Sequence, residues 1–141
     1  MTANTESGHD LDSIELKFPS RAEHLVDVRK AVMRLSRATP LDRQQIEDFL
    51  TAVDEAVANA IRHGSPQGDK NFVYVTCRRS DAALAVEVQD EGSGFRMPRR
   101  APMPGPEAMG GRGLPLMIVL ADKMEVRSSP QGTIVTLHKA P

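Results

Sequence analysis

The sequence has few of the features that mark disulfide-rich, secreted or membrane proteins. It contains one cysteine, Cys77, so no internal disulfide can form, and this favours a reducing compartment. No run of about 18 apolar residues and no basic-then-apolar leader is present, so we expect neither a membrane span nor a signal peptide. We therefore expect a cytoplasmic protein.

Aromatic residues and excess charge are also scarce. There is one tyrosine and no tryptophan, and no basic stretch is interleaved with aromatics, which argues against RNA binding by base stacking. The net charge of −1 gives no general attraction to nucleic acid or to an anionic membrane. No Cys/His cluster suggests zinc, and no Gly-x-Ser-x-Gly elbow suggests a hydrolase.

The pattern of apolar residues predicts one domain with two long helices. Strands are expected near 14–19, 71–79 and 83–89, helices over about 25–39 and 42–63, and a hairpin near 123–139. Residues 1–13 are small, polar and unpatterned, so we expect a flexible tail before a domain spanning 14–139. This order favours an α/β two-layer sandwich, with a mixed, mostly antiparallel sheet covered by one layer of helices.

The helix over 42–63 carries its polar residues on one face. Glu55, Asn59, Arg62 and His63 share that face, which combines a carboxylate with a carboxamide and suits the binding of a metal nucleotide. The opposite face is apolar and consists of Phe49, Leu50, Val53, Val57, Ala60 and Ile61. The alternative interpretation of this segment is an amphipathic helix with a solvated polar face.

A carboxylate continues the buried side of the strand at 83–89. Asp90 follows Leu84, Val86 and Val88 in the alternation, so it points inward and needs a donor, such as a ligand amino group or the hydroxyl of Thr133. Gly92 and Gly94 then allow close approach of the backbone to a flat ligand. The alternative is an ordinary glycine-rich turn.

A second glycine cluster precedes an apolar run. Gly110, Gly111 and Gly113 lead into the predicted helix at 114–120, whose N-terminus suits a phosphate group; the alternative is a mobile linker. The four prolines within 96–109 exclude a regular helix there and favour a nucleotide lid. The guanidinium groups of four arginines near these glycines match phosphate geometry: Arg96, Arg99, Arg100 and Arg112. The alternative is a solvated basic loop.

Together these segments resemble the GHKL family of ATP-binding domains. The matching motifs are an N-box from Glu55 to Asn59, a G1 box Asp90-x-Gly92-x-Gly94, a G2 box Gly111-x-Gly113, and a terminal Gly132-Thr133. The resemblance covers roughly residues 14–139. The motif Glu-Ala-Val-x-Asn-Ala-Ile-x-His-Gly is most similar to that of bacterial anti-sigma-factor serine kinases of the partner-switching branch.

The resemblance implies a Bergerat-type fold, ATP and Mg²⁺ as ligands, and a role for each motif. It implies that Asp90 reads the adenine amino group, that Asn59 holds Mg²⁺, and that Glu55 acts as the catalytic base. The remaining nucleotide-binding positions that it implies are Gly92, Gly94, Gly110, Gly111, Arg112, Gly113 and Thr133. The implied substrate is a serine or threonine of a small anti-anti-sigma regulator of the STAS type, with a sigma factor as second partner and a homodimer as the assembly.

Two other functions are compatible with these motifs. The first is a binding module that uses ATP only as a conformational ligand, although the retained Glu55 argues against it. The second is the ATPase half of a sensor histidine kinase. We expect no upstream helical hairpin with a phosphoacceptor histidine, because only about 13 residues precede the first strand.

Overall fold

Alternating apolar residues form the central strands of the sheet. The computed structural model describes residues 2–4, 12–92 and 120–141. In this part of the chain, β2 (Asp12–Pro19), β3 (Phe72–Ser80) and β4 (Ala83–Gln89) each turn every second side chain toward the helices. The buried residues of these strands are Ile14, Leu16, Phe18, Val73, Val75, Cys77, Leu84, Val86 and Val88.

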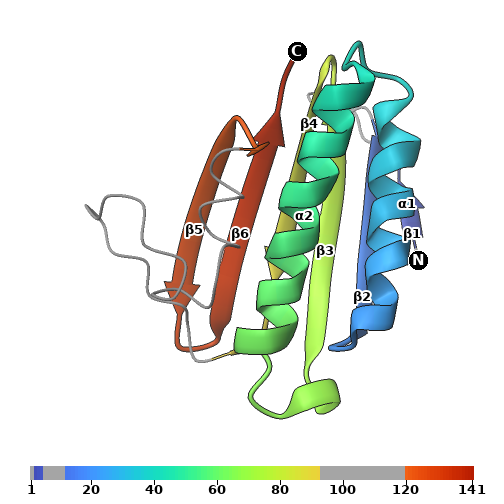
Figure 1. Cartoon of the computed structure of the whole chain (residues 1–141). Coiled ribbons are helices and arrows are strands. Elements are labelled where there is room, and N and C mark those ends of the chain that lie inside the picture. The colour runs from blue at the N-terminus through green and yellow to red at the C-terminus, as the bar shows by residue number, and fades with distance from the viewer. Residues whose placement is uncertain (1, 5–11, 93–119) are drawn as a thin grey trace.

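Six strands form one sheet in the order β1-β2-β3-β4-β6-β5, with two helices on one face (Figure 1). The outer strands are β1 (Thr2–Asn4) and β5 (Lys123–Ser129), and β6 (Gly132–Lys139) lies between β5 and β4. The predicted two-layer α/β class is confirmed. The expectation of a mixed sheet is wrong for the described strands, whose pairings are all antiparallel. Two helices rather than one connect β2 to β3, so the chain returns to the end of the sheet that it left.

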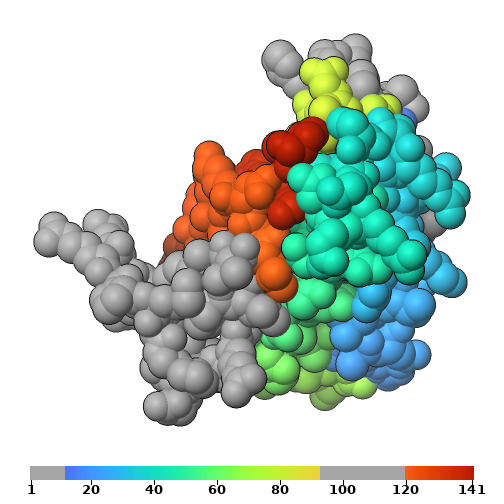
Figure 2. Space-filling model, turned by 45° about the horizontal axis from the view of Figure 1, so that its top comes forward, coloured from blue at the N-terminus to red at the C-terminus, as the bar shows by residue number. Residues whose placement is uncertain are grey.

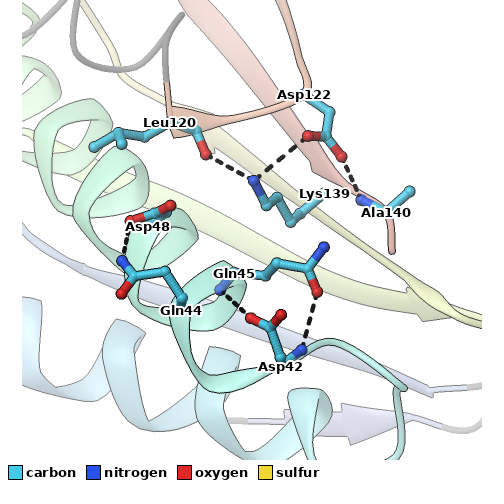
Figure 3. Close-up of polar contacts among 8 residues, drawn as sticks. All are labelled: Asp42, Gln44, Gln45, Asp48, Leu120, Asp122, Lys139 and Ala140. Atoms are coloured by element: carbon cyan, nitrogen blue, oxygen red, sulfur yellow. Dashed lines mark hydrogen bonds and ion pairs between the residues drawn. The ribbon is translucent and has the colours of Figure 1, made fainter.

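Two long helices cover the sheet as predicted. The first, α1 (Leu25–Ser36), follows a short 3₁₀ turn, and α2 (Arg43–His63) ends at Gly64. The start of α2 is fixed by Asp42, whose carboxylate accepts from the Gln45 amide at 2.8 Å, while Gln45 Oε1 accepts from the Asp42 amide at 2.9 Å (Figure 3). None of the helices in the described ranges has the length and apolarity needed to cross a bilayer.

A short strand lies where the sequence predicts only a tail. Residues 2–4 form β1 and pair with β2, with Thr2 opposite Glu15 and Asn4 opposite Ser13, and β2 itself begins at Asp12. The expected tail of residues 1–13 is therefore wrong at 2–4 and 12–13, while residues 1 and 5–11 lie outside the described part. The pairing uses backbone groups along the edge of β2, so it needs no apolar alternation in β1.

The single cysteine lies in the core, as predicted. Cys77 is on β3, is 1% exposed and is free. Burial raises the pKa of its thiol to about 12, so the folded protein holds it as an uncharged and unreactive group.

A buried lysine makes polar contacts at one end of the sheet. Lys139 on β6 donates to the Leu120 carbonyl at 3.2 Å and pairs with Asp122 at 3.4 Å, and Asp122 also accepts from the Ala140 amide at 2.6 Å (Figure 3). Figure 2 shows the last residues of the chain beside the first turns of α2 at this end. These contacts hold the start of β5 against the end of β6. Lys139 pairs with Leu84 at the start of β4, so this is the end of the sheet opposite to Asp90, which follows β4.

Candidate functional site

Three of the predicted site residues, Asp90, Gly92 and Thr133, lie together at the other end of the sheet. The C-terminal end of α2 and the turn between β5 and β6 lie together there (Figure 1). Asp90, which directly follows β4, joins them through its contacts with Gly64, the residue that ends α2, and with Thr133 at the start of β6. Three separate segments of the sequence therefore build one site.

The face of α2 that does not pack carries the predicted polar residues. Glu55, Asn59 and Arg62 lie at helical spacing, and the side chains of Glu55 and Arg62 are 31% and 52% exposed. Arg62 donates from Nη2 to the Asn59 Oδ1 at 3.0 Å, and the same nitrogen lies 4.0 Å from Glu55 Oε2. The two side chains with predicted catalytic and metal-binding roles thus share one guanidinium as a neighbour.

Asp54 has a different environment from its neighbour Glu55. Its Oδ2 accepts from Arg29 of α1 at 2.9 Å, so this carboxylate joins the two helices. Burial raises the pKa of Asp54, the Arg29 charge opposes that rise, and the Glu55 charge adds to it. Of these two adjacent carboxylates, Glu55 is the one on the face shared with Asn59, which supports the prediction that it is the reactive one.

Asp90 is buried, as its position in the alternation predicts. It is 7% exposed, and its Oδ1 accepts from the amides of Gly92 and Thr133, both at 3.0 Å. Burial raises the pKa of Asp90, and these two N–H groups oppose the rise. Within the described residues, no hydrogen bond reaches its second oxygen, Oδ2. The carboxylate is therefore oriented by the backbone amides of Gly92 and Thr133, both of which donate to Oδ1.

Thr133 donates to Asp90 through its backbone amide, whereas the sequence suggests its hydroxyl as a possible donor. The bond between them comes from the Thr133 amide, while the Thr133 hydroxyl lies 3.3 Å from Ser128 Oγ. The reason is the register of β4 and β6, which continues past Gln89: the Asp90 amide donates to the Thr133 carbonyl at 2.9 Å. Backbone pairing therefore brings the Thr133 amide to the carboxylate.

Glycines surround the Asp90 carboxylate because there is no space for a side chain. A Cβ on Gly64 would overlap the carboxylate itself, and one on Gly92 would lie 2.9 Å from the Gly64 Cα. At the β5–β6 turn, Gly132 has φ of +149° and its missing Cβ leaves room for the Asp90 carbonyl. The sequence predicts Gly64 only as the residue that ends α2, because its contact with Asp90 is tertiary.

Gly64→Ala tests this contact. We expect the new methyl group to displace the Asp90 carboxylate, reduce ATP affinity about tenfold or more, and lower the free energy of unfolding by about 1–3 kcal/mol. Calorimetry and urea unfolding measure the two effects. Gly68→Ala is the matched control: Gly68 has φ of +61° with open space around it, so alanine strains the backbone there without touching Asp90. Equal ATP affinities in the two variants would contradict the role of this contact.

Several predicted positions lie outside the described residues. They are the proposed lid at 96–109, with Arg96, Arg99 and Arg100, and the glycine-box residues Gly94, Gly110, Gly111, Arg112 and Gly113. Their roles stay predictions. Glu91, by contrast, is described and has no predicted role, although it accepts hydrogen bonds from three residues. Nothing in its sequence context, an acidic residue before a glycine, signals those contacts.

The described residues fit a magnesium nucleotide. Asp90 Oδ2 is a buried acceptor suited to an amino group, and Asn59 Oδ1 is an oxygen ligand of the kind that Mg²⁺ prefers. Within the described ranges, no group of three or more His, Cys, Asp or Glu side chains could hold a metal alone. In nucleotide sites, Mg²⁺ usually takes most of its ligands from phosphate oxygens and water.

The sequence matches the histidine kinase-like ATPase domain family over residues 18–139. It is 30% identical over 138 residues to a protein of Bacillus velezensis named serine-protein kinase RsbW, covering 92% of this chain and 86% of the relative. It is also 30% identical over 132 residues to a protein of Caldanaerobacter subterraneus subsp. tengcongensis named anti-sigma F factor, covering 89% of this chain and 92% of the relative.

Solved structures share the fold at lower identity. The RsbU and RsbW domains of a Mycobacterium tuberculosis protein match with a TM-score of 0.67 and 19% identity, covering 91% of this chain and 32% of the other. The histidine kinase domain of a blue-light activated histidine kinase from Erythrobacter litoralis matches with a TM-score of 0.57 and 18% identity, covering 86% of this chain and 61% of the other. Both agree with the two-layer arrangement described above.

Proposed function

We propose that this chain, which belongs to the histidine kinase-like ATPase domain family, is an ATP-dependent serine-protein kinase that acts as an anti-sigma factor. The observation that carries the proposal is the joint position of Glu55 and Asn59 on one face of α2, the helix that ends at Gly64 against the buried Asp90. The names of the two relatives at 30% identity support the same activity.

In the proposed site, each described side chain has one task. The Asp90 carboxylate accepts a hydrogen bond from the adenine amino group. Asn59 Oδ1, which accepts one hydrogen bond from Arg62 and has a second lone pair, ligates Mg²⁺. We propose that Gly94, Gly110, Gly111, Arg112 and Gly113 bind the phosphates. Mg-ATP supplies the phosphoryl group that is transferred and the metal charge that stabilises its transition state.

Glu55 performs the proton transfer in this proposal. Its carboxylate accepts the proton of the incoming serine hydroxyl as the serine oxygen bonds to the γ-phosphorus, and the bond from that phosphorus to the ADP oxygen breaks. We propose that the serine belongs to a small anti-anti-sigma regulator of the STAS type, that the chain also sequesters a sigma factor, and that it acts as a homodimer in the cytoplasm.

Phosphate transfer to candidate regulators tests the proposal. The protein is incubated with Mg²⁺, ATP labelled on the γ-phosphate and each STAS-type regulator from the same genome, with serine-to-alanine forms of the regulators as controls. We expect one regulator to be labelled on a serine or threonine and its alanine form to remain unlabelled. Binding of ATP without transfer to any regulator would overturn the kinase proposal and favour a binding module that uses ATP as a conformational ligand.

A further inference from the structure

Glu91, directly after the buried Asp90, accepts three hydrogen bonds although it lies just beyond the end of β4. Its Oε1 accepts from the Phe72 amide at 2.7 Å and from Asn71 Nδ2 at 3.2 Å, and its Oε2 accepts from the Tyr74 hydroxyl at 2.9 Å. These donors lower the pKa of Glu91, the Phe72 amide most of all, so the side chain is an anion held by three groups.

The carboxylate of Glu91 accepts a backbone hydrogen bond from β3 beyond the point where the backbone pairing of β3 and β4 ends. β3 and β4 pair as far as Tyr74 opposite Gln89, and beyond this point Asp90 stays paired with β6 through its amide and the Thr133 carbonyl. On the β3 side, the Glu91 side chain takes the Phe72 amide in place of a backbone carbonyl. The turn that carries Asp90 is therefore tied to strands on both sides.

The same carboxylate also fixes the loop that follows α2. Asn71, which donates to Glu91, is 9% exposed and accepts from the Gln67 amide at 2.7 Å through its Oδ1. The loop from Gly64 to Asn71 begins at the glycine that contacts both the Asp90 carboxylate and Gly92. Glu91 thus fixes this loop at Asn71. At the other end of the loop, Gly64 contacts Asp90 and Gly92, the two sequence neighbours of Glu91.

We propose that Glu91 is a positioning residue for nucleotide base recognition: it holds the Asp90 turn and the Gly64 loop in the register that aims Asp90 Oδ2 at the 6-amino group of adenine. This inference rests on the proposed function, in which Asp90 reads adenine. Glu91 itself contacts neither the base nor the reacting atoms. Its effect passes through Asp90, so it must be specific to the base and independent of the phosphates.

The test compares two nucleotides that differ at the 6-position of the base. Affinities for Mg-ATP and for inosine triphosphate, which has no 6-amino group, are measured by calorimetry on the full chain. Wild-type protein should prefer ATP. In Glu91→Ala, we expect ATP affinity to fall about tenfold or more while inosine triphosphate affinity changes little, so the preference is lost. A role in general stability would weaken both nucleotides equally.

Graded variants keep the test informative if Glu91→Ala does not fold. Glu91→Gln retains a neutral oxygen for Phe72 and Asn71, and Tyr74→Phe removes only the bond to Oε2, so each should reduce the preference for ATP partly, by about two- to fivefold. Glu87→Ala, on β4 between the buried Val86 and Val88, is the matched control outside this cluster and should keep the wild-type preference.

The outcomes separate this inference from the proposed function. Wild-type preference retained in Glu91→Ala, or in both Glu91→Gln and Tyr74→Phe when the alanine variant does not fold, would overturn the positioning role. Wild-type protein that binds neither nucleotide, or binds both equally, would instead overturn the assignment of adenine recognition to Asp90.

Discussion

Glu55→Gln should bind ATP with unchanged affinity and transfer its γ-phosphate roughly 10²- to 10⁴-fold more slowly than the wild type. The amide keeps the size of the carboxylate but cannot accept the serine proton, so the loss appears in the chemical step. The exposure of Glu55 supports an effect on transfer without an effect on ATP binding. Its side chain is 31% exposed on the polar face of α2, so its replacement should not disturb the core. Single-turnover transfer to the regulator that serves as substrate measures the rate, and calorimetry measures ATP affinity.

Two variants on the same helix serve as comparisons for Glu55→Gln. Glu47→Gln removes a carboxylate paired with Arg43 at 3.2 Å near the start of α2, and its transfer rate should equal that of the wild type. Asn59→Ala should differ in kind, because it removes a metal ligand and weakens the Mg²⁺-dependent part of ATP binding. Transfer by Glu55→Gln at the wild-type rate would show that another group takes the serine proton.

Asp90→Asn should reduce ATP affinity about 5- to 150-fold, which corresponds to roughly 1–3 kcal/mol. The substitution replaces a charged acceptor by a neutral one and, in one orientation, presents an NH₂ group to the adenine amino group, where donor meets donor. Burial raises the pKa of Asp90 above its unfolded value, so the ionised carboxylate lowers the folding stability at neutral pH. Loss of the charge removes that cost, and we expect no large fall in stability to accompany the loss of affinity.

The control for Asp90→Asn is Asp81→Asn in the β3–β4 turn. Asp81 is exposed and has φ of +52°, a conformation that asparagine tolerates well, so neither stability nor ATP affinity should change. Calorimetry on both variants, with urea unfolding for stability, makes the comparison. Wild-type ATP affinity in a folded Asp90→Asn variant would exclude Asp90 as the group that reads the base.

The elements and residues that the sequence predicts correctly are those set by local periodicity. The apolar alternation of β4 continues to Asp90 and predicts its burial, and the 3.6-residue repeat of α2 separates Glu55 and Asn59 from the core residues. The helix predicted from about residue 42 likewise agrees with α2, which begins at Arg43. In each case, the side chain's direction follows from its own segment, so no knowledge of the tertiary structure is needed.

The residues that the sequence does not predict depend on contacts between distant segments. Gly64 contacts Asp90 and Glu91 accepts from Phe72, and these pairs are 26 and 19 residues apart. The register of β4 and β6 decides that Thr133 offers its amide. β1 has only three residues, too few for an alternation that could reveal the strand.

The buried thiol of Cys77 can report the opening of β3 through its reaction with a labelling reagent. A thiol-specific reagent cannot reach a group that is 1% exposed in β3, which is flanked on both sides by other strands, so labelling requires that strand to open. Because the chain has no other cysteine, the labelling rate follows one site without engineering. A nucleotide that binds only the closed form slows labelling by the factor 1 + [L]/Kd when opening limits access at equilibrium. Unmodified protein can therefore report both its opening equilibrium and its nucleotide affinity.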